Sequence, residues 1–321
     1  MTWHHCFRFG RLRPDGRARR MTKRWADEVS YQTGGGADGG LAAFALTHAD
    51  LTKQRIDHAF LVTWNGRDWD EQHTLTWSVA GVCRISRPRP AWIAVGVNGQ
   101  ALVVEGTLGR EEPIGEGEEA AGRIGFLRAA RSIEGRAYAV GMCRQVYCRT
   151  DEGVWQRIDR DCRRPSGDWS IVGFESIDGF AANDLYAVGL QGEIWHGDGV
   201  RWSRIDSPTN VILTQVCCAE DGIVYACGRK GMLLKGRADR WEVIEHSIHG
   251  DDFWGMAWFK GRLFIATLYY LCVFDGANVV LVTADGSPSS AYHLSATADR
   301  LWSIGPHEVS TFDGTDWERF D

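Results

Sequence analysis

The sequence predicts an all-β fold, a seven-bladed β-propeller built from four-stranded antiparallel blades. Three observations predict it. The motif at residues 184–206, DLYAVGLQGEIWHGDGVRWSRID, recurs along the chain. Its period is near 40 residues, a length typical of one propeller blade. The chain also holds 15 Trp and 38 Gly against 8 Pro, and large flat rings with many tight turns suit stacked antiparallel sheets.

Residues 1–40 are expected to form a basic N-terminal extension, followed by a single propeller domain over residues 41–321. Residues 8–24 carry eight Arg or Lys side chains and one Asp, a charge of +7 within a chain of net charge −6. Such an arm binds nucleic acid or an acidic partner, or folds onto the acidic body. No basic face with interleaved aromatic residues follows it, so nucleic acid is an unfavoured partner. Met21 is an alternative start that would remove residues 1–20.

The stretch TGGGADGG has Gly-x-Gly-x-x-Gly spacing at Gly34, Gly36 and Gly39. A dinucleotide-binding fold needs further βαβ units, and only propeller repeats follow. We therefore interpret the stretch as a flexible connector and expect no cofactor. The alternative is that this N-terminal segment completes the first blade.

Cysteine usage and hydropathy predict the compartment. The nine cysteines form no Cys-x-x-Cys pair, and several stand inside apolar runs where Cys acts as a small buried hydrophobe. The first residues lack the apolar core of a secretion signal, and no apolar run is long enough to span a membrane. These features predict a cytoplasmic protein with free thiols and no membrane contact.

The repeats divide the rest of the chain into blades. The residue that closes each Tyr-Ala-Val-Gly unit falls at Gly96, Gly141, Gly189, Gly228, Thr267 and Gly305, at intervals of 45, 48, 39, 39 and 38 residues. Each unit continues through a Gly-containing turn and a third strand to an Asp-Gly or Asn-Gly turn before its last strand. These dipeptides reach the positive φ that tight hairpins require. Six units are clear and one is partial, which predicts seven blades.

The unit YAVGLQGEIWHGDGVRW resembles the repeats of bacterial Asp-box (BNR-like) and WD40-YVTN-like propellers, and those of photosystem II assembly-factor propellers. The resemblance covers about residues 59–321. In the family the boxed Asp closes its own turn and the Trp packs between blades, which implies structural roles here. The implied pairs are Asp151 with Trp155, Asp198 with Trp202, and Asp313 with Trp317. Asn65 replaces the Asp in another copy, and the copy at Asp275 lacks its Trp.

Long joins between blades are the expected binding regions. They lie at 109–123, which is acidic, and at 160–169, 246–254 and 283–292. In a propeller such joins emerge on one face, together with the turns inside the repeat units. Aromatic side chains beside carboxylates are good anchors for a protein partner, and ordinary solvated loops are the alternative. The residues expected to bind the partner are Glu111, Glu112, Glu118, Glu119, Trp169, His246, His249, Asp251, Asp252, Trp254, Tyr269, Tyr270 and Tyr292.

The channel mouth is predicted by counting 13 residues back from each repeat position, which gives Cys83, Arg128, Ser176, Gln215, Trp254 and Tyr292. This set holds neither a metal-ligating cluster nor a nucleophile with a base, so no catalytic residue or metal is assigned. His293 and His307 are candidates only by residue type. A hydrolase or lyase in the channel is the runner-up function.

The sequence therefore favours a non-catalytic, bacterial-type scaffold that binds a protein through the loop-rich face. An acidic body suits a basic partner. An inhibitor or immunity protein for a secreted toxin fits a stand-alone cytoplasmic propeller of this charge.

Overall fold

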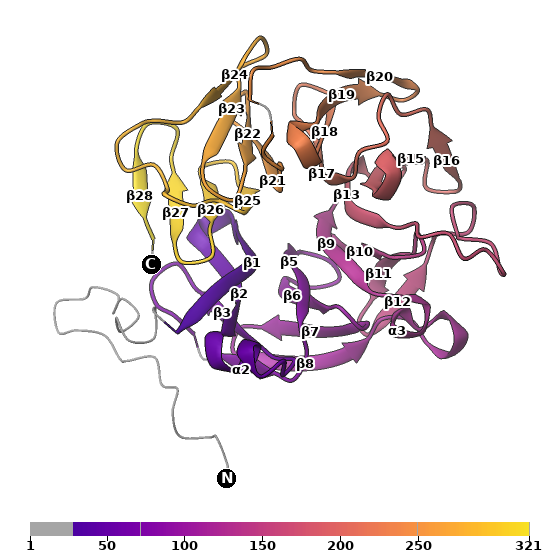
Figure 1. Ribbon diagram of the computed structural model, residues 1–321. Helices are drawn as coiled ribbons and strands as arrows, with labels where there is room; N and C mark the ends of the chain where they lie inside the picture. Colours follow the sequence, from indigo (N-terminus) through magenta and orange to yellow (C-terminus); the bar gives the residue numbers. More distant parts are fainter. Residues whose placement is uncertain (1–27, 71, 249, 321) are drawn as a thin grey trace.

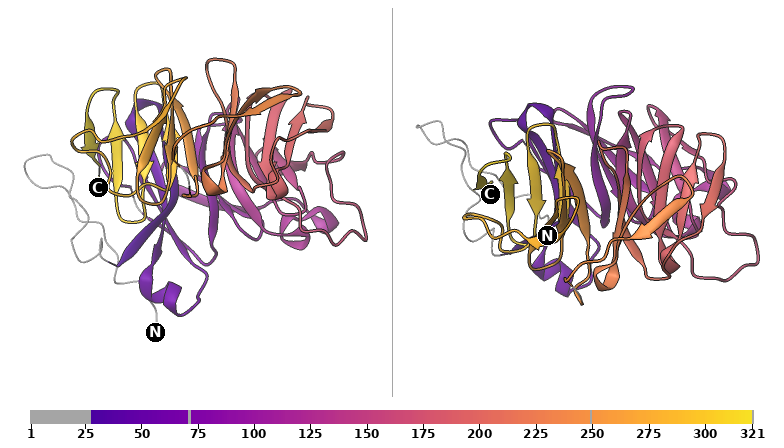
Figure 2. Two further views of the ribbon diagram at one scale, coloured as in Figure 1. Left: turned by 45° about the horizontal axis from the view of Figure 1, so that its top comes forward. Right: turned by 90° about the horizontal axis from the view of Figure 1, so that it is seen from above.

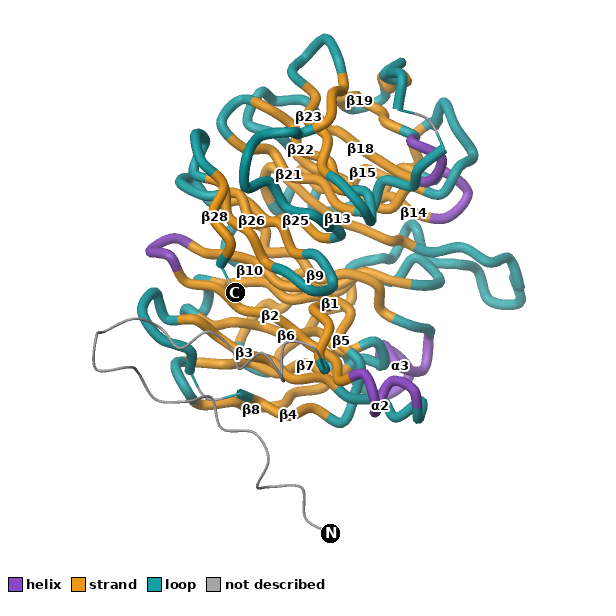
Figure 3. Tube along the Cα trace, turned by 60° about the vertical axis from the view of Figure 1, so that its left-hand side comes forward, coloured by secondary structure: helices purple, strands orange, loops and turns teal. Residues whose placement is uncertain are grey.

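The computed structural model describes residues 28–70, 72–248 and 250–320. Twenty-eight strands form seven four-stranded antiparallel sheets, arranged as a ring around a central channel (Figure 1). The predicted seven-bladed propeller is confirmed. Within these described ranges, helices are confined to short segments between strands (Figure 3). They are η1 (Asp38–Gly40), α2 (Ala49–Lys53), η2 (Gly117–Glu119), α3 (Ala121–Ile124), η3 (Leu190–Gly192) and η4 (Arg229–Gly231).

In every blade the first strand lines the channel and the fourth lies at the rim. The strands of blades 1 to 3 are β1 (Val29–Ala37), β2 (Leu41–His48), β3 (Ala59–Trp64), β4 (His73–Leu75), β5 (Val79–Ile85), β6 (Ala91–Gly96), β7 (Gln100–Glu105), β8 (Leu108–Pro113), β9 (Leu127–Ile133), β10 (Arg136–Gly141), β11 (Val146–Asp151) and β12 (Val154–Arg157).

Blades 4 to 7 follow the same order around the ring. Their strands are β13 (Phe174–Ala181), β14 (Asp184–Gly189), β15 (Ile194–Gly197), β16 (Trp202–Ile205), β17 (Leu213–Cys218), β18 (Val224–Gly228), β19 (Leu233–Arg237), β20 (Arg240–Val243), β21 (Gly255–Phe259), β22 (Arg262–Ala266), β23 (Leu271–Phe274), β24 (Val279–Leu281), β25 (His293–Ala296), β26 (Leu301–Ile304), β27 (Val309–Phe312) and β28 (Trp317–Arg319).

The antiparallel order gives the ring two different faces. The joins between blades and the second turn of each blade emerge together on one face, which we call the loop-rich face. The first and third turns emerge on the opposite face, which we call the turn face. In blades 2 to 5 a recurring backbone hydrogen bond ties the join to the second turn that follows it, as from Leu190 N to Gly173 O at 3.0 Å and from Arg229 N to Ile212 O at 3.0 Å. Helix α2 extends beyond the ends of the strands (Figure 2).

The interior consists of seams between neighbouring blades. Successive side chains of an inner strand point to opposite faces of its sheet, and so into the seams with the two neighbouring blades. Val82 packs towards blade 1, for example, whereas Cys83 packs towards blade 3. Each seam is therefore a layer of apolar residues between two sheets. In the part of the chain that the structure describes, no helix is long and apolar enough to cross a membrane.

The ring closes without a shared strand, because each blade is formed from one continuous segment. Blade 1 packs directly on blade 7. In β1, a Cβ atom on Gly36 would lie 1.9 Å from Trp302 Nε1, and one on Gly35 would lie 2.6 Å from Ser295 Oγ. Only glycine permits this approach. Phe320 completes the seam, with its ring centroid 6.0 Å from that of Phe44 and 4.8 Å from that of Trp302.

The interpretation of TGGGADGG as a flexible connector is wrong. Thr33–Ala37 belongs to the innermost strand of blade 1, and Asp38–Gly40 forms its first turn. Gly35 and Gly36 are needed for close packing at the closing seam, whereas Gly39 and Gly40 adopt the positive φ of the first turn. Residues 29–40 instead form the first strand and the first turn of blade 1, which corresponds to the alternative that this segment completes the first blade. The basic arm at 8–24 and Met21 lie outside the described residues.

Candidate functional site

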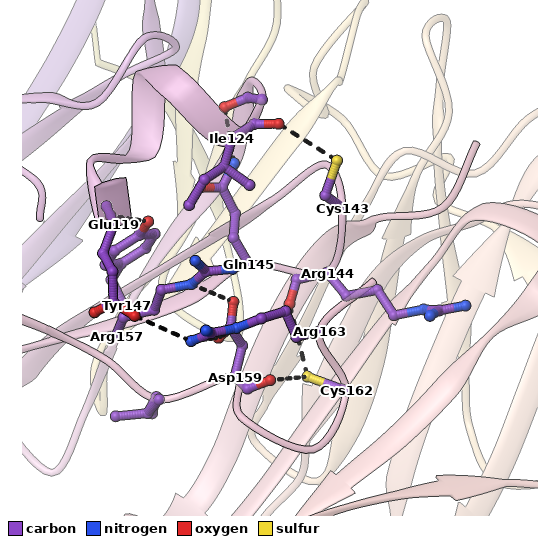
Figure 4. A network of polar contacts seen from close by, with 12 residues as sticks. Glu119, Ile124, Cys143, Arg144, Gln145, Tyr147, Arg157, Asp159, Cys162 and Arg163 are labelled. Carbon is purple, nitrogen blue, oxygen red and sulfur yellow. Dashed lines mark hydrogen bonds and ion pairs between the residues drawn. The ribbon is translucent and has the colours of Figure 1, made fainter. Parts of the chain in front are cut away.

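Two long joins on the loop-rich face are fixed to blade 3 by polar contacts (Figure 4). The first join, residues 114–126, receives hydrogen bonds from the Tyr147 hydroxyl to Glu119 O at 2.6 Å and from Gln145 Nε2 to Gly125 O at 2.8 Å. The second join, residues 158–173, is held at Asp159. This buried carboxylate accepts hydrogen bonds from Arg157 Nε at 2.7 Å and Arg163 Nε at 3.0 Å.

The ends of these two joins meet at the second turn of blade 3. Met142 N donates to Phe126 O at 2.9 Å, and Cys143 N donates to Val172 O at 2.8 Å. Gln191 Nε2 donates to Ile171 O at 3.1 Å from the next blade. The backbone that carries Phe126 and Ile171 is therefore fixed, although their side chains point out of the core.

This arrangement creates the first aromatic surface of the face, the blade 3–4 surface, formed by Phe126, Trp169 and Ile171. Their exposed fractions are 57%, 88% and 71%. Asp168 Oδ1 caps the loop by accepting from Ser170 N at 2.8 Å, and Arg164 Nη1 donates to Ser170 O at 3.2 Å. Three large apolar side chains are thus presented by ordered loops, an arrangement suited to anchoring a partner.

A second group, the blade 6–7 surface, contains Trp254, Tyr269, Tyr270 and Tyr292. Trp254 packs beside Tyr292 with ring centroids 5.6 Å apart, and the Arg229 guanidinium lies 5.9 Å from the Trp254 ring centroid. Tyr270 is hydrogen-bonded through its hydroxyl to Asp251. Burial and this hydrogen bond raise the pKa of Tyr270 to about 12. Only Tyr269 in this group is largely exposed, at 67%.

Three other residues expected to bind the partner, His246, Asp251 and Asp252, make contacts inside the protein instead. Asp252 Oδ1 accepts from Lys230 N at 2.9 Å, which fixes η4. His246 Nε2 lies 2.8 Å from Gly231 O, and its ring packs 5.5 Å from that of Phe253. With Asp251 bound to Tyr270, these side chains hold the loop 244–254 in place. His249 lies outside the described residues.

The acidic insert is divided between a strand and a join. Residues 108–113 form the outer strand β8, so the expectation that the join starts at 109 is wrong. Glu111 is on that strand and accepts from Trp77 Nε1 at 3.1 Å. Of the four acidic residues expected to bind a partner in this insert, only Glu118 and Glu119 lie in the join itself, beside Glu116. Both are exposed, with Arg123 at 3.2 Å from Glu118 and Arg163 at 3.3 Å from Glu119.

The expectation that Glu112 binds a partner is contradicted by its burial. Glu112 lies in the seam between blades 2 and 3, where Arg149 is its buried ion-pair partner at 2.5 Å. Trp155 Nε1 donates to the same carboxylate at 2.9 Å. Glu112 therefore stabilises a seam and is unavailable to a partner.

The boxed residues lie on the turn face and in the seams. The Asp198 carboxylate accepts from the backbone N–H groups of Val200 at 2.8 Å and Arg201 at 2.7 Å, and Asp313 and Asp151 likewise accept from the backbone of their own turns. These hydrogen bonds lower the pKa of Asp198 and Asp313. Three boxed Trp side chains are buried between blades: Trp155, Trp202 and Trp317.

The channel is a cavity of about 780 Å³, and all six residues expected at its mouth line it. Cys83 is deeper than expected, because β5 begins at Val79 and the repeat count fails in this blade. Arg128 pairs with Glu175 at 2.8 Å near the mouth. His293 starts β25, and burial lowers its pKa to about 4. His307 lies in the second turn of blade 7.

Within the described ranges, no group of three His, Cys, Asp or Glu side chains is arranged to hold a metal ion. The residues that sequence reasoning missed are Phe126 and Ile171. Each lies just before a channel-lining strand, among apolar residues whose pattern predicts a buried side chain. The only signal for them is that both lie in long joins.

Comparisons with known proteins agree with this architecture. The chain is 40% identical over 286 residues to the immune protein Tsi7 of Pseudomonas aeruginosa PAO1, covering 88% of this chain and 94% of that protein. A structure of YCF48 bound to D1 peptide has a TM-score of 0.65 at 15% identity, covering 90% of this chain and 93% of that one. The WD40 propeller domain of Doa1 has a TM-score of 0.63 at 11% identity, over 90% and 94% of the two chains. No protein-family model matches the chain.

Proposed function

Because the chain belongs to the family of the immune protein Tsi7, we propose that this immunity protein binds a toxin through the loop-rich face of its propeller. The observation that carries the choice of face is the distribution of exposed aromatic residues. Of the residues that the structure describes, three aromatic side chains are more than half exposed. Phe126, Trp169 and Tyr269 all belong to joins or second turns, hence to the loop-rich face.

Interface physics supports this choice. Tyr, Trp and Phe are enriched at the centres of protein–protein interfaces, where they fill pockets and exclude water. A soluble protein rarely exposes such a cluster without a role for it. The turn face exposes aliphatic residues singly, such as Val200 at 85%, and single exposed residues need no functional explanation.

The charge of the partner is inferred from this chain. The net charge of −6, together with Glu118 and Glu119 on the first join, supports a basic toxin, because opposite charge accelerates encounter. Free thiols in eight of the described residues support a cytoplasmic location. The turns closed by Asp151, Asp198 and Asp313 support kinship with Asp-box repeats.

The direct experiment is co-expression with the cognate toxin, which is to be sought first among the genes that neighbour this one. The wild-type protein is expected to restore growth of cells that express the toxin and to form a stoichiometric complex with it. A toxin that remains active and unbound in the presence of wild-type protein would remove the proposal.

The basic character of the toxin has its own test. Replacing Glu118 and Glu119 with Lys is expected to slow association several-fold, with the effect shrinking as salt is added. The matched control reverses Asp299 and Asp316 on the turn face to Lys. Equal slowing by the two variants would mean that general attraction, rather than the loop-rich face, guides the encounter.

A further inference from the structure

The channel contains charged residues that neither the propeller framework nor the loop-rich face explains. Three arginines line its cavity, Arg84, Arg128 and Arg131. Two of them are neutralised from the next blade. Arg128 pairs with Glu175 at 2.8 Å, and Arg131 binds both oxygens of Asp178 at 3.0 and 3.2 Å.

Arg84 has no such partner. Among the described residues, no carboxylate oxygen lies within 4.0 Å of its guanidinium and no acceptor takes a hydrogen bond from it. Its guanidinium carbon lies 5.5 Å from the centroid of the Trp92 ring, the one contact recorded for its charged end in this part of the chain. The side chain is partly buried, and that burial lowers the pKa of Arg84.

The neighbouring strand explains why the charge is unmatched. Val82 and Trp92 pack in the seam with blade 1, and Arg84 alternates to the same side as Val82. The strand that blade 1 places there is β1, where Gly34, Gly35 and Gly36 carry no side chains. A cation that lines a cavity opposite a glycine strand is left without a carboxylate.

The same end of the cavity is otherwise suited to an anion. Ser86 and Ser132 line it and contribute hydroxyl groups. Asp38 also lines it, but its side chain is exposed and does not reach Arg84 within 4.0 Å. A guanidinium in partly dehydrated surroundings binds carboxylate and phosphate groups through short, charge-assisted hydrogen bonds.

We propose that the end of the channel near the turn face binds a small organic anion, whose carboxylate or phosphate group pairs with Arg84. This site is separate from the loop-rich face and does not depend on the identity of the toxin. The shared chemistry of the ligand is a compact anionic group of a size that enters a cavity of about 780 Å³.

The test is calorimetric titration of the full-length protein with two probes, inorganic phosphate and citrate, in a low-chloride buffer. The wild-type protein is expected to bind at least one of them saturably at one site. Preference for phosphate would indicate a phosphorylated ligand, and preference for citrate a carboxylate. Arg84→Gln is expected to weaken binding about tenfold or more, as for one lost charge-assisted hydrogen bond.

Two further variants keep the test decisive. Arg87→Gln removes a cation of the adjacent turn that does not line the cavity, and its affinity is expected to equal that of the wild type. Asp38→Asn is expected to bind as tightly or more tightly, because it removes a nearby negative charge. The melting temperature without probe shows that each variant is folded. Absence of saturable binding to the wild type, or equal weakening by Arg84→Gln and Arg87→Gln, would overturn the proposal.

Discussion

The loop-rich face carries two aromatic surfaces that are built in opposite ways. In the blade 3–4 surface, Phe126, Trp169 and Ile171 project from loops that are held by backbone contacts, and their own side chains remain largely exposed. In the blade 6–7 surface, Trp254 and Tyr270 contact Tyr292, Arg229 and Asp251. The first surface presents its side chains outward, whereas the second uses most of them to maintain its own loops.

This difference teaches that residue type alone does not identify a binding residue. An anchor contributes to affinity when its loop is ordered before binding and its side chain is still exposed, because little entropy is then lost on association. The blade 3–4 surface satisfies both conditions. Tyr269 is the one strongly exposed member of the blade 6–7 surface that has no such internal role in the contacts recorded for the described residues.

The largest expected effect concerns Glu112, which lies in the seam between blades 2 and 3. Glu112→Ala leaves the buried Arg149 guanidinium without its carboxylate and removes the acceptor of Trp155. Loss of one partner of a buried ion pair is expected to cost about 3–5 kcal/mol of unfolding free energy. Chemical denaturation measures it. Glu116→Ala, at an exposed position in the join that follows this strand, is the control, and equal losses would contradict the internal role of Glu112.

The next effect breaks the first surface itself. Trp169→Ala combined with Ile171→Ser is expected to cost about 2–4 kcal/mol of toxin-binding free energy, as for hot-spot residues, while leaving stability nearly unchanged. Titration of the purified toxin measures the affinity. Val200→Ser, equally exposed but on the turn face, should bind like the wild type. An unchanged affinity for the double variant, with a large loss for Tyr269→Ala, would assign the anchor to blades 6 and 7.

The third effect is a pH dependence of stability that arises from His293, the neighbour of Tyr292 in the blade 6–7 surface. His293 has a pKa near 4 in the folded protein, below its ordinary value of 6.5. The unfolded chain therefore binds this proton first as the pH falls. The neutral imidazole therefore contributes fully to the free energy of unfolding above about pH 6.5. This contribution, up to about 3 kcal/mol, is lost as the pH falls towards 4. Denaturation at several pH values should show this slope in the wild type and a reduced slope in His293→Asn.

The smallest effect concerns the Tyr270–Asp251 hydrogen bond. Tyr270→Phe keeps the ring and removes the hydroxyl, so it is expected to cost about 1 kcal/mol of stability and to change toxin affinity little. The measurements are denaturation and titration on the same preparation. A large loss of affinity with unchanged stability would place Tyr270 in the interface and contradict its assignment to the loop.

Much of the fold could be predicted from the sequence, because the repeat of about 40 residues reports directly on the blades. The strand boundaries and the burial of single residues within a blade could be predicted less well. The outer strand β8, Leu108–Pro113, is rich in charge and lacks the alternation that marks a strand, so Glu112 was placed in a loop. Its burial depends on Arg149 of the next blade, a contact that no local pattern reports.

The candidate site was only partly predictable for a related reason. Trp169 lies in a polar loop, PSGDWS, and its exposure follows from that context. Phe126 and Ile171 stand beside strand residues, in a context typical of the core. The turn at Met142 and Cys143 binds only the backbone of these joins, and both side chains stay exposed. Which side of a join faces solvent is decided by the neighbouring blade.

Hydrogen–deuterium exchange of the full-length protein, with and without the purified toxin, tests the central claim most directly. Binding through the loop-rich face predicts slower exchange in the joins 114–126 and 158–173 and in the second turns beside them. The first and third turns of the blades should exchange at unchanged rates. Protection confined to those turns, or no protection at saturating toxin, would contradict the account.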